Sequence, residues 1–152
     1  LTADCLPVLL TNLKGTEIAI IHAGWRGICG GILSKTVNKM CSEPNDLMAW
    51  LGPAIGPCHY EVGDDLKIAF KRSIRSKKLW SRIEKCFEVS STEGKFFLNL
   101  YKAVTTILNH LGVSNIYVDD YCTFRDSKKY FSYRRDGETG RMVSTIFIDP
   151  KV

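Results

Sequence analysis

The sequence has 152 residues, of which 45% are hydrophobic and 24% are charged, and its formal net charge is +5. These values are typical of one soluble globular domain with a sizeable core. They exclude a transmembrane protein, because no apolar run reaches the roughly 18 residues needed to span a bilayer. The N-terminus shows no secretory signal, so we expect a cytoplasmic protein with no membrane partner.

Basic residues are frequent between Lys67 and Lys85, which raises the question of a nucleic-acid partner. No motif with interleaved aromatic residues supports that interpretation, and a solvated helix face explains the charges more simply. We therefore expect no nucleic-acid partner. A modest positive field would also favour an anionic small substrate.

The chain contains six cysteines at irregular spacing, and none of them forms a CxxC pair. The apolar content is high enough to build a core without disulfides. We therefore predict reduced thiols in a cytosolic protein and no structural zinc knuckle.

The first predicted element is a β-hairpin. Two apolar runs, at residues 5–10 and 17–22, flank a turn signal at residues 12–15. The chain begins inside the first of these strands and without a methionine. We therefore expect a single domain over residues 1–152 that lacks its N-terminal segment.

A glycine loop around Trp25 and Arg26 follows the hairpin, and the apolar spacing from Ile28 to Met40 then predicts a helix. A helix that begins after such a loop can hold an anion with its free backbone N–H groups.

The remaining pattern predicts alternating strands and helices, and hence an α/β domain whose buried strands are covered by helices. A rigid loop rich in glycine and proline occupies residues 52–60, and Gly112 ends the longest helix. The predicted strands are 48–51, 116–118, 131–135 and 142–148, and the predicted helices are 62–72, 78–85 and 97–111.

Cys5 and His22 lie near the same open end of the predicted hairpin, and this placement admits three interpretations. A thiolate and an imidazole together bind zinc or copper well. The same two side chains could form the nucleophile and base of a cysteine hydrolase. They could also be a buried thiol beside a hydrogen-bonded core histidine.

The neighbours of this pair favour a functional site, because buried polar groups need partners. Arg26 could clamp a phosphate or a carboxylate with two hydrogen bonds, or it could be an ordinary surface arginine. Asp4 could orient a metal ligand as a hydrogen-bond acceptor, or it could serve a strand edge or turn.

Four blocks of sequence resemble the YfiH-like laccase-domain family, also called polyphenol oxidase or peptidoglycan editing factor. They are TADCLPV at residues 2–8, HAGWRG at 22–27, GPAIGPCHYEVG at 52–63 and FSYRRDGETGRM at 131–142. The blocks occur in the family's order and extend from one end of the chain to the other, so the resemblance is highly specific.

The resemblance implies a fold, a metal site and an activity. The fold would be the YfiH-like layered α/β sandwich, a mixed sheet covered by helices. The metal would be held by one cysteine and two histidines, of which Cys5 and His22 are two, and the remaining histidine lies upstream in a segment absent here. The family was first described as copper-dependent phenol oxidases. It is now linked to phosphorolysis of adenosine, inosine and methylthioadenosine, to adenosine deamination, and to peptidoglycan editing.

The histidine content helps to choose among these activities. The chain has three histidines, His22, His59 and His110. These are too few to ligate a multicopper cluster, but they can contribute a ligand to a single zinc site that keeps one position open. We interpret His110, at a helix end, and His59, in the rigid loop, as structural. Zinc-bound water suits deamination, whereas phosphorolysis needs a phosphate clamp.

We therefore predict a zinc-dependent purine nucleoside phosphorylase that also deaminates adenosine. Its small-molecule partners would be a purine nucleoside and phosphate, and its oligomeric state would be a monomer or a homodimer. Cys5 and His22 would bind the metal and, with Arg26, take part in catalysis. The substrate contacts would be Asp4, Trp25, Tyr60 and Arg135, with Arg134 and Arg141 as weaker candidates.

Three alternatives stay open at this point. The first is a copper-dependent polyphenol oxidase. The second is a cysteine hydrolase with Cys5 as its nucleophile, acting in peptidoglycan editing. The third is a non-catalytic scaffold that binds a structural metal.

Overall fold

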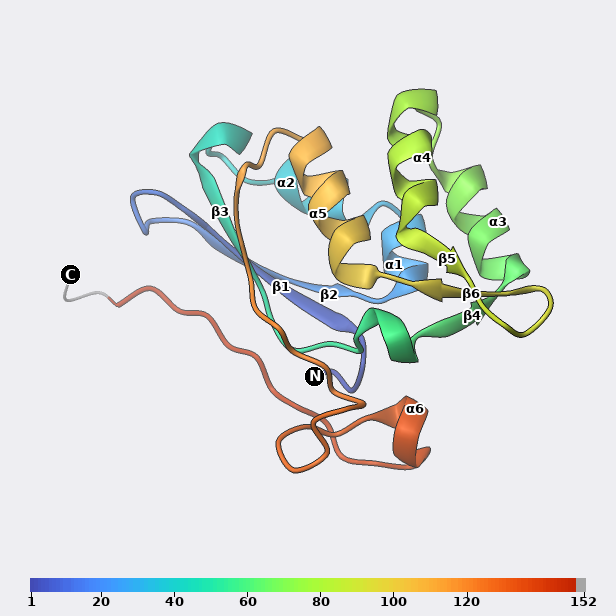
Figure 1. Ribbon diagram of the computed structural model, residues 1–152. Coiled ribbons are helices and arrows are strands. Elements are labelled where there is room, and N and C mark those ends of the chain that lie inside the picture. The colour runs from blue at the N-terminus through green and yellow to red at the C-terminus, as the bar shows by residue number, and fades with distance from the viewer. Residues whose placement is uncertain (150–152) are drawn as a thin grey trace.

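Two β-sheets and a layer of helices make up residues 1–149, which are the residues that the computed structural model describes (Figure 1). The larger sheet has the strand order β2-β1-β3-β7 and the smaller one β4-β6-β5. Residues 150–152 of the predicted domain lie outside the described part. The larger sheet consists of β1 (Leu6–Asn12), β2 (Ile18–Ala23), β3 (Leu47–Leu51) and β7 (Asn115–Val118), and the smaller one of β4 (Glu61–Gly63), β5 (Phe87–Val89) and β6 (Lys95–Leu98).

The larger sheet is mixed, as the predicted fold class requires. Strand β1 pairs antiparallel with both β2 and β3, while β3 pairs parallel with β7. Side chains alternate between the two faces of a strand, and Val8 lies between Ile21 and Leu51 on the buried face. The predicted hairpin and the predicted strands at 48–51 and 116–118 are therefore confirmed.

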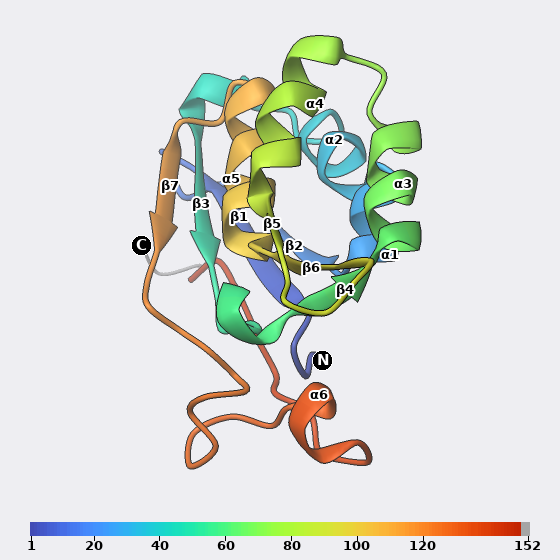
Figure 2. The same cartoon turned by 45° about the vertical axis from the view of Figure 1, so that its right-hand side comes forward.

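Helices cover one face of the larger sheet in both views (Figures 1 and 2). Buried residues of α2 and α5, among them Leu33, Val104 and Leu108, join Val8 and Leu10 in the hydrophobic core. Burial of these apolar side chains is the main stabilising contribution to the domain. The helices are α1 (Trp25–Cys29), α2 (Ile32–Val37), α3 (Asp64–Ser73), α4 (Lys77–Ile83), α5 (Leu100–His110) and α6 (Tyr133–Asp136), with 3₁₀ turns η1 (Pro44–Asp46), η2 (Pro57–His59) and η3 (Glu84–Cys86).

Two predicted helices have different bounds in the structure. The helix expected from Ile28 onward is two short helices, because Gly31 adopts a left-handed φ of 75° and interrupts the hydrogen-bonded turns. The helix expected at 97–111 begins only at Leu100, where the Asn99 side chain caps it by accepting from the backbone N–H of Lys102. Phe97 belongs to β6 instead.

The helix predicted at 62–72 also begins later, because Val62 belongs to β4 and pairs with Phe96. Helix α3 then starts at Asp64. The helix predicted at 78–85 is confirmed as α4, which is continued by the turn η3.

The two predicted C-terminal strands, at 131–135 and 142–148, are wrong. Ser132 caps a single helical turn, α6, by accepting from the backbone N–H of Arg135 at 3.2 Å. Beyond it, Met142 forms one isolated bridge with Thr2. An alternating apolar pattern forms a strand only beside a partner strand, and within residues 1–149 the stretch at 143–148 has none.

The arrangement places the C-terminal segment beside the beginning of the chain. In both views α6 lies next to the N-terminus, at the end of the larger sheet where β1 begins (Figures 1 and 2). In the described part of the chain no helix is long and apolar enough to cross a membrane. All six cysteines are free.

Candidate active site

A pocket of about 380 Å³ opens where β1 begins and β2 ends. This volume is within the range typical of small-molecule sites. Its walls come from the N-terminal stretch, the end of β2, the loop before β4, and the segment around α6. Among the residues singled out in the sequence, those that line the pocket are Asp4, Cys5, His22, Trp25, Tyr60, Arg134 and Arg141, whereas Arg26 and Arg135 do not.

Cys5 and His22 are brought together at this pocket. Cys5 immediately precedes β1, and His22 lies on β2 opposite Pro7. Gly24 lies close to both side chains. A Cβ atom added to it would lie 3.0 Å from Cys5 Sγ and 3.6 Å from His22 Nε2. Both donor atoms therefore lie around the same point, which the absence of a side chain at Gly24 leaves open.

This donor pair has the chemistry of two zinc or copper ligands. Within residues 1–149 no group of three or more His, Cys, Asp and Glu side chains has the geometry to hold a metal ion. A catalytic zinc site takes three protein ligands, so the described residues fit as part of such a site.

The protonation of Cys5 is set by its surroundings. Burial raises the pKa of the thiol above its usual value, the negative charge of Asp4 raises it further, and the positive charge of Arg141 opposes the change. The thiol is therefore protonated at neutral pH in the absence of a cation. A metal ion that binds there must displace this proton, so its affinity increases with pH.

Tyr60 and Arg134 form one wall of the pocket. The guanidinium of Arg134 lies 5.4 Å from the centroid of the Tyr60 ring, and its Nη1 donates to the backbone carbonyl of Glu61 at 2.6 Å. Burial raises the pKa of Tyr60 to about 12, with a smaller contribution from the nearby Cys5. Its phenol keeps its proton at neutral pH and can donate a hydrogen bond to a ligand.

Trp25 and Arg26 occupy the first turn of α1. The Trp25 ring lines the pocket, and the guanidinium of Arg26 stacks on it, 4.3 Å from the ring centroid. Arg26 itself is exposed. Its positive charge opposes, to a small extent, the rise in the pKa of Tyr60.

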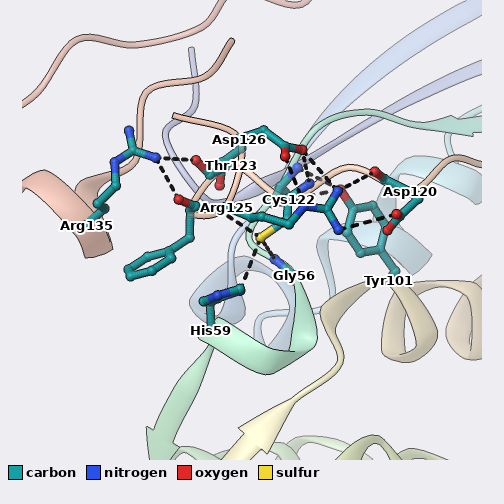
Figure 3. A network of polar contacts seen from close by, with 11 residues as sticks. Gly56, His59, Tyr101, Asp120, Cys122, Thr123, Arg125, Asp126 and Arg135 are labelled. Atoms are coloured by element: carbon teal, nitrogen blue, oxygen red, sulfur yellow. Dashed lines mark hydrogen bonds and ion pairs between the residues drawn. The ribbon is translucent and has the colours of Figure 1, made fainter. Parts of the chain in front are cut away.

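The Arg135 side chain points into the loop that follows β7 (Figure 3), and Arg135 does not line the pocket. Its Nη1 donates to the carbonyls of Thr123 at 2.6 Å and Phe124 at 2.9 Å, and its Nη2 donates to Tyr130 at 3.0 Å. It also pairs with Asp136 at 2.7 Å. These contacts give Arg135 a place in the loop's structure, and they offer no support for a substrate contact.

The chain has a second neighbouring cysteine and histidine: the Sγ of Cys122, in the loop after β7, lies 3.4 Å from Nδ1 of His59 in η2 (Figure 3). The sulfur of Cys122 also accepts from the backbone N–H groups of Gly56 at 3.2 Å and Arg125 at 3.4 Å. The His59 ring stacks on Phe124 at 4.6 Å. Neither residue of this pair lines the pocket, in agreement with a structural role for His59.

Sequence reasoning missed Thr123 and Tyr133. Tyr133 lines the pocket, and Thr123 is fully buried with its hydroxyl donating to Asp4 Oδ1. The signal for Tyr133 was present in the block at 131–142, but the strand predicted there concealed which side chains face the pocket. Thr123 gave no signal, because a threonine after a strand is common in loops.

Comparison with known proteins shows the family to which the chain belongs. The multi-copper polyphenol oxidoreductase laccase family matches the chain over residues 1–149. The chain is 46% identical to the Haemophilus influenzae protein named purine nucleoside phosphorylase, over 98% of this chain and 59% of that protein. It is 42% identical to Escherichia coli purine nucleoside phosphorylase YfiH, over 97% of this chain and 58% of that protein.

Solved structures give the same result. A Neisseria meningitidis protein matches with a TM-score of 0.81 and 42% identity, over 90% of this chain and 53% of that one. YlmD from Geobacillus stearothermophilus matches with a TM-score of 0.78 and 32% identity, over 90% and 50%. The fold is that of an α/β protein of the YfiH type. The chain belongs to the multi-copper polyphenol oxidoreductase laccase family, and it spans between half and three fifths of the length of these relatives.

Proposed function

We propose that the intact protein is a purine nucleoside phosphorylase and that the pocket around Cys5 and His22 binds both of its substrates. The observation that supports this most strongly is the convergence of a thiol, an imidazole and two guanidinium groups on one pocket of about 380 Å³. Relatives that are at least 42% identical to this chain over 148–150 aligned residues carry the name purine nucleoside phosphorylase.

The metal in this proposal is zinc, held by Cys5, His22 and the upstream histidine that the family resemblance implies. Within the described residues the pocket brings together one thiol and one imidazole, a donor set that suits a share of a single zinc site with an open position. A zinc ion would polarise a substrate oxygen or lower the pKa of a water molecule, and the second of these suits adenosine deamination in the same pocket.

The arginines of the pocket supply the phosphate clamp. Each guanidinium carries five N–H donors. Arg134 donates to one carbonyl and Arg141 to two, through a single nitrogen in each case, which leaves donors for a phosphate. Arg26, stacked on Trp25 next to the pocket, would add positive field for the anion.

The nucleoside would lie against Tyr60 and Trp25, whose rings offer stacking surfaces to a purine. In phosphorolysis a phosphate oxygen forms a bond to C1′ of the sugar, the bond from C1′ to the purine nitrogen breaks, and the base takes up a proton. In this proposal the protonated Tyr60 phenol, which lines the pocket, would donate a hydrogen bond to the departing base.

The test is an assay of the intact protein, with zinc bound, on inosine and phosphate. We expect ribose 1-phosphate and hypoxanthine in equal amounts, and loss of both products in Cys5→Ala. A metal-free protein that hydrolyses its substrate through a covalent Cys5 adduct would overturn the proposal in favour of a cysteine hydrolase. Phenol oxidation with stoichiometric copper would favour the oxidase, and a zinc-loaded protein inert in every assay would favour a scaffold.

A further inference from the structure

Asp4 has an unusual backbone and a fully engaged side chain. It is the one non-glycine residue between 1 and 149 with a positive φ, at 82°, a conformation that is uncommon for such residues and is tolerated best by aspartate and asparagine. Its side chain is buried. Its own carbonyl accepts from the backbone N–H of Ile55 at 3.0 Å, which fixes the peptide just before Cys5.

The carboxylate of Asp4 forms hydrogen bonds to two separate points of the C-terminal segment, which is the part of the described chain that follows β7. Oδ1 accepts from the Thr123 hydroxyl at 2.6 Å, and Oδ2 accepts from the backbone N–H of Arg134 at 2.7 Å. An ionised acceptor makes these bonds shorter and stronger than neutral ones. Asp4 is therefore the shared anchor of the loop after β7 and of the turn α6.

The anchored segment carries three of the pocket's wall residues: Tyr133, Arg134 and Arg141. It has no place in either sheet, and its other attachment to the beginning of the chain is the bridge between Thr2 and Met142. Arg134 also donates to the Glu61 carbonyl, but Asp4 is the residue that joins both the loop at Thr123 and the turn α6 to the backbone just before Cys5.

We propose that Asp4 is a positioning residue, whose carboxylate holds Arg134 and the rest of the C-terminal wall over Cys5 so that the guanidinium groups meet the phosphate. This inference rests on the proposed function of the pocket and deepens it. It replaces a direct substrate contact by Asp4, because both carboxylate oxygens already accept bonds from the protein.

Three variants of the intact, zinc-loaded protein separate positioning from a direct role of the charge. Asp4→Ala removes both bonds to the segment. Asp4→Asn keeps the backbone preference and both bonds, because its amide oxygen can accept from the Arg134 N–H while its NH₂ group donates to the Thr123 hydroxyl. Thr123→Val removes one bond and leaves Asp4 unchanged.

We expect Asp4→Ala to raise the KM for phosphate about tenfold or more, with kcat reduced less than about threefold and zinc content unchanged. Asp4→Asn should recover most of the lost affinity, and Thr123→Val should fall between the two. If Asp4→Asn is as damaging as Asp4→Ala, or if both lose zinc, the charge acts directly on the metal or the substrate and the positioning role is wrong.

Hydrogen exchange of the same variants tests the anchor without any reliance on activity. Amides at 131–142 should exchange about tenfold faster in Asp4→Ala than in the wild-type protein, while those of α5 stay unchanged. Unaltered exchange at 131–142 would overturn the inference. If the wild-type protein fails to convert inosine while Asp4→Ala still shows this faster exchange, the proposed function is refuted and the anchoring role of Asp4 stands.

Discussion

The chain contains two cysteine–histidine pairs, and their surroundings differ in every respect that matters for chemistry. Cys5 and His22 face a pocket, with open space between them at Gly24. Cys122 is buried with 4% of its surface exposed, and its sulfur already accepts from two backbone N–H groups while its partner His59 stacks on Phe124.

This difference shows that a cysteine and a histidine close together are not sufficient to form a metal site. A ligand pair needs lone pairs that are free to point at a common open position, and it needs a path for the ion. The Cys5 pair offers both. The lone pairs of the Cys122 sulfur are directed at backbone donors, so this pair stabilises a loop rather than a ligand.

The largest effect is expected when the two cysteines are replaced separately. Cys5→Ala should lower the zinc content of the intact protein from about one ion to below about 0.1, and kcat/KM for inosine about a thousandfold or more. Elemental analysis and steady-state kinetics provide the measurement.

The matched control is Cys122→Ala. It should keep its zinc and its activity within about threefold, and should lose about 1–3 kcal/mol of unfolding free energy, because two buried N–H groups lose their acceptor. Loss of zinc in Cys122→Ala, or full zinc in Cys5→Ala, would reverse the assignment of the two pairs.

Gly24→Ala should impair metal binding by Cys5 and His22 and leave the Cys122–His59 pair unaffected. The backbone at Gly24 is extended, with a φ of −78°, so alanine causes no backbone strain there. The new Cβ would lie 3.0 Å from Cys5 Sγ, and it should weaken zinc binding about a hundredfold. Calorimetric titration with zinc measures this, and the melting temperature of the metal-free protein should stay near the wild-type value. An unchanged zinc affinity would show that the ion binds elsewhere.

The arginines of the C-terminal segment sharpen the comparison further. Arg141→Gln should raise the KM for phosphate about tenfold, because this guanidinium faces the pocket. Arg135→Gln should leave that KM within about threefold and lower the melting temperature, since its bonds hold the Thr123 and Phe124 carbonyls. Equal kinetic effects of the two changes would contradict the orientation of these side chains.

Removal of the metal should affect activity far more than structure. Dialysis against a chelator should abolish phosphorolysis, and added zinc should restore it, while the unfolding transition shifts modestly in proportion to the ligand's binding energy. Activity that survives complete removal of zinc would refute a metal-dependent mechanism.

Local features of the fold could be predicted from the sequence, and distant ones could not. The hairpin and the meeting of Cys5 with His22 follow from one turn signal between two apolar runs. The conformation of residues 131–148 depends instead on Asp4 and Thr2, more than a hundred residues away, so local propensity alone predicted strands there. The hydrogen bonds of Arg135 to the loop carbonyls had no local signal for the same reason.

The measurement that tests the central assignment most directly is the visible and near-ultraviolet spectrum of the intact protein with cobalt in place of zinc. A cobalt–thiolate bond produces an intense charge-transfer band. The band should appear in the wild-type protein and in Cys122→Ser, and should be absent from Cys5→Ser. A band that persists in Cys5→Ser, or that disappears in Cys122→Ser, would contradict the assignment of Cys5 and His22 as the metal-binding pair.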